Sequence, residues 1–116
     1  MRADRIVAQA KKRAEKKWIA CALDREAIAA RIRGGRCEVT GVAFDFSIRS
    51  ERTQHVAPFA PSVDRIDPAK GYTMDNIQIV AWAYNAAKAT GTHEDVLRLA
   101  RAVLAAEAAR ALSGTG

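Results

Sequence analysis

Apolar and basic residues follow a helical pattern in the first third of the chain. Apolar side chains recur at helical spacing from Ile6 to Cys21, and most lysines and arginines of this segment fall on the other side. The pattern predicts an amphipathic basic helix. Asp24 is suited to cap a further helical segment over residues 24–32, which the glycines at 34–35 end. The pattern leaves open whether this region is one bent helix or two.

The pattern changes to that of strands after the two glycines. Residues 42–46 alternate between large and small or polar side chains, which predicts a short strand, and residues 47–60 form a polar loop. Two further strands are predicted at 61–66 and 77–80. They are joined by a turn region that contains Pro68 and a glycine.

Helical patterns return in the last third of the chain. Residues 81–90 are compatible with a helix that ends at Gly91. Thr92 then opens, in the manner of a capping box, an alanine- and leucine-rich helix that continues to about Leu112. The elements together predict an α+β fold that is mainly helical.

The length of 116 residues and a hydrophobic content of 49% suit one globular domain, 1–116. We expect three regions within it. A basic helical region spans 1–36, a strand-containing core spans 37–91, and a C-terminal helix spans 92–112.

The positive charge is concentrated in the first region. The chain carries a net charge of +6, and residues 1–36 hold 11 Lys and Arg against 4 Asp and Glu, whereas the remainder holds 8 against 9. A basic helix of this kind indicates a partner that bears phosphates, or only a solvated face, and charge alone leaves both open.

Other features of the composition bear on the cellular setting. No apolar run approaches the roughly 20 residues that cross a bilayer, and the N-terminus lacks the apolar core of a signal peptide, so no membrane partner is expected. Cys21 and Cys37 form no CxxC pair and are expected to stay reduced. A cytoplasmic location follows as an expectation.

Polar residues of the types that act in catalysis and metal binding cluster in and around the stretch PSVDRIDPAKGYTMDN, residues 61–76. Asp64 falls on the first predicted strand, Asn76 opens the second, and Asn85 lies on the following helix with Lys88 three residues beyond. In isolation, such residues are common as caps and turn formers. Their joint order along strand, loop, strand and helix is more specific.

That order resembles the HNH endonucleases, whose ββα-metal core carries a DH strand motif, a central Asn and a final His or Asn on the helix. The matching positions are Asp64-Arg65, Asn76 and Asn85-Ala86-Ala87-Lys88. Cys37-Glu38-Val39-Thr40-Gly41 together with the stretch over 61–80 is similar to phage- and prophage-type HNH proteins. The resemblance covers about residues 37–90 and implies an HNH-like ββα core flanked by helices.

The resemblance places a divalent cation at Asp64 and Asn85. Carboxylate and amide oxygens are hard ligands that suit a single Mg²⁺ or Mn²⁺, which would neutralise charge on a scissile phosphate. Asn76 is expected to hydrogen-bond the backbone across the loop instead of touching the metal. The alternative is that these three residues only cap and turn the chain.

Two departures from the family pattern affect these expectations. The general-base histidine is replaced by Arg65, which cannot accept a proton and is expected to clamp a phosphate or pair with Asp67. His55 and His93 are the available histidines, and we assign neither a catalytic role. Many relatives also carry a zinc site of four cysteines, of which only one position is retained here. No structural zinc is therefore expected.

Core packing is expected to replace the zinc. The residues at the other three ligand positions are Thr40, Ala81 and Tyr84. Apolar packing is predicted for Cys37 and for the aromatic and aliphatic side chains near the strands, and for the aromatic residues it is favoured over base stacking. These side chains are Phe44, Phe46, Val80, Trp82 and Tyr84.

The function expected from the sequence is that of a small metal-dependent HNH-like endonuclease. Its catalytic residues would be Asp64, Arg65, Asn76 and Asn85. Phosphate contacts are expected from the basic side chains Lys11, Lys12, Arg13, Lys16, Lys17, Lys70 and Lys88.

Two alternatives remain open. One is a catalytically degenerate HNH-like nucleic-acid-binding module, and the other is a protein-interaction factor that uses the C-terminal helix to pack on a partner or on its own copy. DNA is favoured over RNA as the nucleic acid. The sequence predicts neither base specificity nor oligomeric state.

Overall fold

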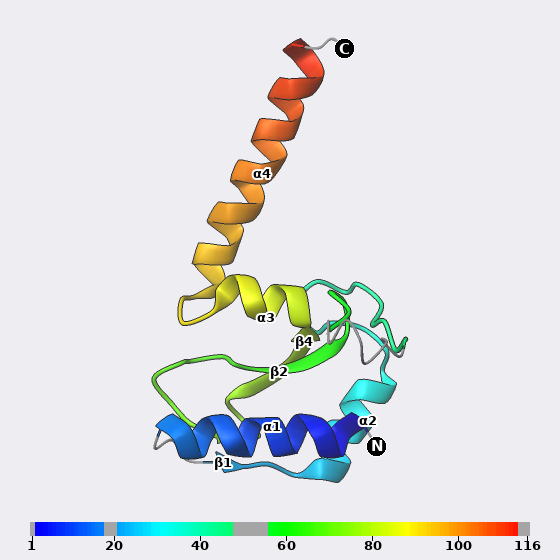
Figure 1. The fold of residues 1–116 in the computed structure, drawn as a ribbon, viewed down its shortest axis with the longest axis vertical. Coiled ribbons are helices and arrows are strands. Elements are labelled where there is room, and N and C mark those ends of the chain that lie inside the picture. The colour runs from blue at the N-terminus through cyan, green and yellow to red at the C-terminus, as the bar shows by residue number, and fades with distance from the viewer. Residues whose placement is uncertain (1, 18–20, 48–55, 114–116) are drawn as a thin grey trace.

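The computed structural model describes residues 2–17, 21–47 and 56–113. The fold is α+β and mainly helical, as predicted (Figure 1). The elements in chain order are α1 (Arg2–Lys17), β1 (Cys21–Ala22), α2 (Arg25–Arg33), β2 (Pro61–Arg65), β3 (Tyr72–Thr73), β4 (Ile77–Ala81), α3 (Trp82–Lys88) and α4 (His93–Ser113).

An antiparallel strand pair forms the centre of the fold. β2 pairs with β4 in a register that places Asp64 opposite Gln78 and Arg65 opposite Ile77, which confirms both predicted strands. Helix α3 follows β4 directly. In Figure 1 the strand pair lies between α1 and α3, and both helices contact β2.

The helical first third consists of two helices. Asp24 caps α2, because its Oδ1 atom accepts hydrogen bonds from the backbone N–H groups of Glu26 and Ala27. Between the helices, Cys21 and Ala22 form a parallel pair with Tyr72 and Thr73 of β3. The sequence did not predict this second pair.

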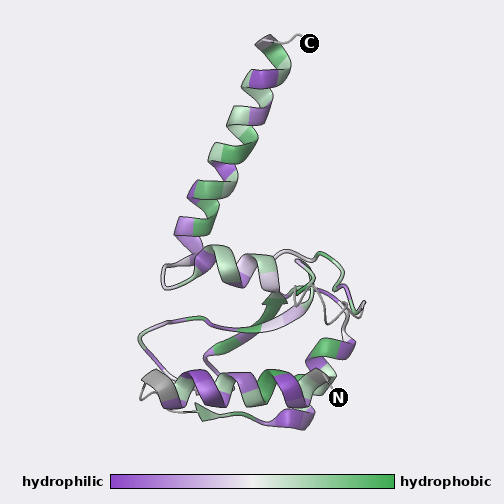
Figure 2. Cartoon of the chain, viewed as in Figure 1, coloured by the Kyte–Doolittle hydropathy of each residue, from purple (hydrophilic) through white to green (hydrophobic). Residues whose placement is uncertain are grey.

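Helix α1 is amphipathic as predicted. Its buried residues are Ala3, Ile6, Val7, Ala10 and Ala14, whereas Lys11 and Lys12 are exposed. Figure 2 shows the corresponding alternation of hydrophobic and hydrophilic bands along the helix. The buried side of α1 joins α2, β2 and β4 in one hydrophobic cluster, whose fully buried side chains include Ile28, Val63, Ile79 and Val80.

The predicted strand over residues 42–46 is wrong. Only Ala43 makes a bridge, to Arg36, because the neighbouring backbone groups bond elsewhere: the N–H of Asp45 donates to the carbonyl of Phe59. Gly41 has φ +77°, a left-handed conformation that favours glycine and closes a tight turn before this segment. Phe44 is buried there without belonging to a strand.

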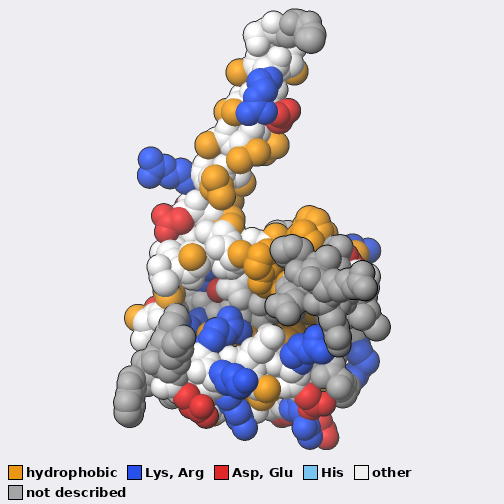
Figure 3. Space-filling model, viewed as in Figure 1, with side chains coloured by type: hydrophobic (Ala, Val, Ile, Leu, Met, Phe, Trp, Pro, Cys, Tyr) orange, Lys and Arg blue, Asp and Glu red, His pale blue; other side chains and the backbone are white. Residues whose placement is uncertain are grey.

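Helix α4 extends away from the rest of the fold (Figures 1 and 3). None of its described residues is buried, and Leu99, Val103, Leu104 and Leu112 are all more than half exposed, the last at 89%. Exposed apolar side chains of this kind are typical of interaction surfaces. This surface agrees with the interaction-factor hypothesis, which stays a prediction.

In the described part of the chain, no helix has the length and apolar character needed to span a membrane.

Candidate functional site

Asp64 is buried beside a lysine. Its side chain is 5% exposed, and its Oδ2 atom lies 2.8 Å from Nζ of Lys88. The same oxygen accepts a hydrogen bond of 2.7 Å from Nε2 of Gln78, the residue opposite in β4. The carboxylate is thus fixed by one charged and one neutral donor, while its other oxygen accepts no hydrogen bond from the described residues.

Lys88 occupies the buried end of α3. Its side chain is 2% exposed, and Nζ also donates to the carbonyls of Arg65 at 2.5 Å and Ile66 at 3.4 Å. Tyr84 lies one turn earlier on the same helix face and is also buried. Lys88 therefore lies inside the fold, where its ammonium pairs with Asp64 and donates hydrogen bonds to two backbone carbonyls. This position does not suit the predicted phosphate contact.

Tyr84 links α3 to the start of α4. Its hydroxyl lies 2.9 Å from Nδ1 of His93. Burial raises the pKa of Tyr84, and the negative charge of Asp64 raises it further. The phenol consequently stays protonated at ordinary pH and serves as a structural hydrogen-bonding group.

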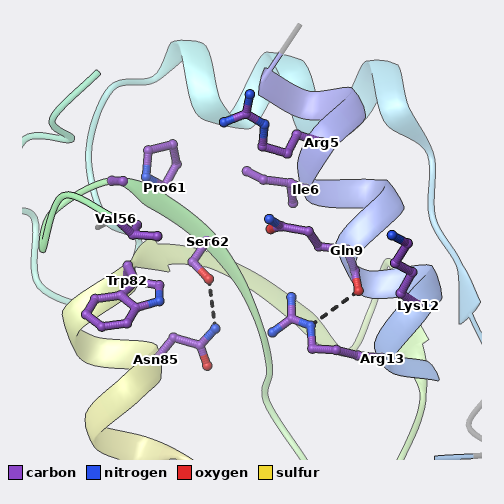
Figure 4. Close-up of a pocket in the computed structure, with 11 residues that line it drawn as sticks. Arg5, Ile6, Gln9, Lys12, Arg13, Val56, Pro61, Ser62, Trp82 and Asn85 are labelled. Atoms are coloured by element: carbon purple, nitrogen blue, oxygen red, sulfur yellow. Dashed lines mark hydrogen bonds between the residues drawn. The ribbon is translucent and has the colours of Figure 1, made fainter. Parts of the chain in front are cut away.

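Asn85 is half-buried and lines the same cavity as Asp64. Its Nδ2 atom donates to Oγ of Ser62 at 2.8 Å and to the carbonyl of Val63 at 3.1 Å, which anchors α3 to β2 (Figure 4). Its Oδ1 atom accepts no hydrogen bond from the described residues. Asp64 and Asn85 both line one cavity of about 390 Å³, so the structure brings the two predicted metal ligands to the same space.

Asn76 holds the loop between β2 and β4 together. Its Nδ2 donates to the carbonyls of Asp67 and Gly71, at 3.1 and 2.8 Å, and its Oδ1 accepts from the N–H of Asp67 at 3.0 Å. These are the cross-loop backbone contacts expected from the sequence. Asn76 is buried and does not line either cavity described here, so its role is to shape the loop.

Arg65 is bound to the same loop. Its Nη1 atom donates to the carbonyls of Pro68 at 2.9 Å and Lys70 at 3.1 Å, and its guanidinium lies 5.1 Å from the ring centroid of Tyr72. These contacts take the place of the predicted pairing with Asp67. The half-buried side chain still lines the cavity with Asp64.

A second cavity of about 440 Å³ adjoins the first between α1 and α3 (Figure 4). Arg13 belongs to the walls of both cavities, and its guanidinium lies 5.7 Å from the ring centroid of Tyr72, the same ring that Arg65 covers. Arg5 and Lys12 add two further cations from α1. Three cations of α1 thus face the space next to Asp64 and Asn85.

The other predicted phosphate contacts are more scattered. Lys11 is exposed on α1 outside both cavities, and Lys70 is exposed in the loop after β2. The side chains of Lys16 and Lys17, and all of His55, lie outside the described part of the structure. Figure 3 shows Lys and Arg side chains over the lower part of the molecule, where α1 lies.

The donors at the site suit a hydrated hard cation better than a fully caged one. Asp64 and Asn85 each have an oxygen that accepts no hydrogen bond from the described residues, and Mg²⁺ is commonly held by one or two such groups plus waters. Among the described residues, no three His, Cys, Asp or Glu side chains gather at one point. Lys88 opposes a cation electrostatically, because its ammonium already neutralises Asp64.

Two aromatic predictions need correction. The sequence predicts core packing for Trp82 and Phe46, but they are exposed at 42% and 46%. Phe44, Tyr84 and Cys37 are buried as expected.

Sequence reasoning also missed the polar partners that fix the site. These are Ser62 and Gln78. Each lies between two buried residues on its strand, and this position is the sequence signal that could have identified it.

Comparison of the chain with protein-family models, with curated proteins and with solved structures gives no match.

Proposed function

We propose that the protein is a small metal-dependent nuclease with an HNH-like ββα core formed by β2, β4 and α3. One observation carries the proposal. Asp64 on β2 and Asn85 on α3 line a single cavity, and Arg13 and Arg65 contribute cations to its walls. Hard oxygen donors beside guanidinium groups suit a phosphodiester, because the cations bind the phosphate while the oxygens hold a metal ion.

Each residue of the site has a distinct part in this proposal. Asp64 and Asn85 would hold Mg²⁺ or Mn²⁺, which when bound acts as a Lewis acid on the phosphate and its leaving oxygen. Arg13 binds and orients the backbone of the nucleic acid from the opposite wall. Asn76 fixes the loop whose carbonyls hold Arg65.

A second candidate function is nucleic-acid binding without cleavage. The ion pair between Lys88 and Asp64 supports it, because this lysine supplies the positive charge that a metal would bring. Arg65, at the position of the family's general base, cannot take a proton from water. DNA remains the favoured partner in both proposals.

Plasmid nicking with Mg²⁺ or Mn²⁺ tests the proposed function and separates the two candidates. We expect slow, metal-dependent nicking by the native protein and loss of nicking in Asp64→Asn. Asparagine keeps the shape and the hydrogen-bonding oxygen of the side chain while removing its charge. Thermal unfolding of the variant controls for its stability. Binding without nicking under either cation, with native and variant protein alike, would establish the second candidate instead.

Binding is expected to depend on cations that line the cavities more than on other cations of α1. Lys12→Gln should weaken binding to unrelated sequences alike and reduce the slope of log Kobs against log salt by about 0.7–0.9, the value for one phosphate contact. Lys11→Gln is the matched control, because Lys11 is exposed on the same helix but outside both cavities. Fluorescence anisotropy across a salt series measures both variants. Equal effects of the two substitutions would mean that the nucleic acid contacts the whole exposed face of α1 and not the cavity walls in particular.

A further inference from the structure

Trp82 is an exposed aromatic residue that the packing of α3 against the strands does not need. It is the first residue of α3, and the inward face of that helix is already filled by Tyr84 and Lys88. The residue is 42% exposed and lines both cavities. A large aromatic side chain that stays open to two adjoining cavities is available to a ligand.

The wall opposite the indole is cationic. Arg5, Lys12 and Arg13 of α1 line the larger cavity, and none of the described residues around it is acidic. Figure 4 shows Trp82 on α3 and the α1 side chains Arg5 and Arg13 around one space. The cavity therefore combines an aromatic surface with positive charge from a separate element.

We propose that Trp82 is a stacking platform for an unpaired base and that the substrate class is single-stranded nucleic acid. A base stacks on the indole while the phosphates on either side of it contact Arg13 and the other α1 cations, the combination that sequence-independent single-strand binding uses. In a duplex, both faces of each base are covered by neighbouring bases. A duplex can therefore use this surface only after a base has left the stack.

The dimensions of the site agree with this ligand. The two cavities, of about 440 and 390 Å³, fall in the range of roughly 300–1,000 Å³ that holds small ligands. They share Arg13, Trp82 and Asn85 in their walls, so a strand stacked at Trp82 continues toward Asp64. The inference rests on the proposed function and gives it a substrate class.

Substitution of Trp82 tests the platform by binding alone, without cleavage. For a thymidine oligonucleotide of about 12 nucleotides, Trp82→Leu should raise Kd about 5- to 150-fold, and Trp82→Phe should restore most of the affinity. Phe59→Leu is the matched control, because Phe59 is similarly exposed at 46% but lines neither cavity. We expect it to leave Kd unchanged. The native protein should bind the same strand more weakly once it is annealed to its complement.

Fluorescence provides a second measurement that does not depend on a Trp82 variant folding. The chain has two tryptophans, so Trp18→Phe leaves the indole of Trp82 as the only one. The single-stranded oligonucleotide should quench its emission with the Kd measured by anisotropy. Binding without quenching, or equal Kd values for Trp82→Leu and Phe59→Leu, would overturn the stacking role while leaving nucleic-acid binding in place. Absence of any binding would overturn both this inference and the proposed function.

Discussion

Replacing Lys88 by methionine is expected to lower the free energy of unfolding by about 3–5 kcal/mol. Methionine fills a similar space but removes the ammonium that lies 2.8 Å from Asp64. The carboxylate is then left almost fully buried, with Gln78 as its one remaining donor among the described residues, and the carbonyls of Arg65 and Ile66 lose the ammonium. Breaking a buried pair on one side costs more than the pair contributes, because the remaining charge is uncompensated.

Urea unfolding measures this cost, with the denaturant slope as a check that the denatured state is unchanged. Lys70→Met is the matched control, because Lys70 is exposed, and we expect a change within about 0.5 kcal/mol. Adding Asp64→Asn to Lys88→Met should recover part of the loss, since the buried side chain is then neutral. A Lys88→Met protein as stable as the native one would mean that water reaches Asp64 and that the pair is not structural.

The burial of Lys88 also shows why part of the site could be predicted and part could not. Local sequence patterns are sufficient to predict that Asp64, Asn76 and Asn85 follow one another on strand, loop and helix. The structure brings Asp64 and Asn85 to one cavity. The depth of each side chain depends on how α3 is rotated against β2, which no local pattern encodes. Tyr84 and Lys88 lie four residues apart and so turn inward together, which leaves Trp82 outside.

The same limit applies to the strands. β2 and β4 are each five residues long. Alternation from Ser62 onward predicts the first, and the β-branched run Ile77-Gln78-Ile79-Val80 predicts the second, so local patterns are sufficient for both. β1 and β3 are two residues long and join Cys21 to Tyr72, a pairing set entirely by tertiary contacts. At 42–46 the alternation was present but misleading, because the backbone of this segment bonds to residues outside any neighbouring strand.

The largest expected effect on activity concerns position 65. Arg65→His is expected to raise metal-dependent cleavage by about 10²–10⁴-fold over a slow native rate, the usual contribution of a positioned general base. Arg65 lines the cavity with Asp64 and Asn85, but a guanidinium has no atom that can accept a proton. A neutral imidazole at the same position accepts the proton of the attacking water. Nicking assays in Mg²⁺ and Mn²⁺ measure the rate, and anisotropy checks that affinity is roughly retained.

Arg65→Gln separates the proton acceptor from the loss of the arginine. Both substitutions give up the guanidinium contacts to the carbonyls of Pro68 and Lys70, but only histidine can take a proton. The rate of the histidine variant should rise with pH through the ordinary imidazole pKa of about 6.5, because the neutral form is the base. The glutamine variant should show no such rise. If both variants instead cleave more slowly than the native protein, Arg65 acts through its charge on the phosphate and belongs among the catalytic residues as an electrostatic group.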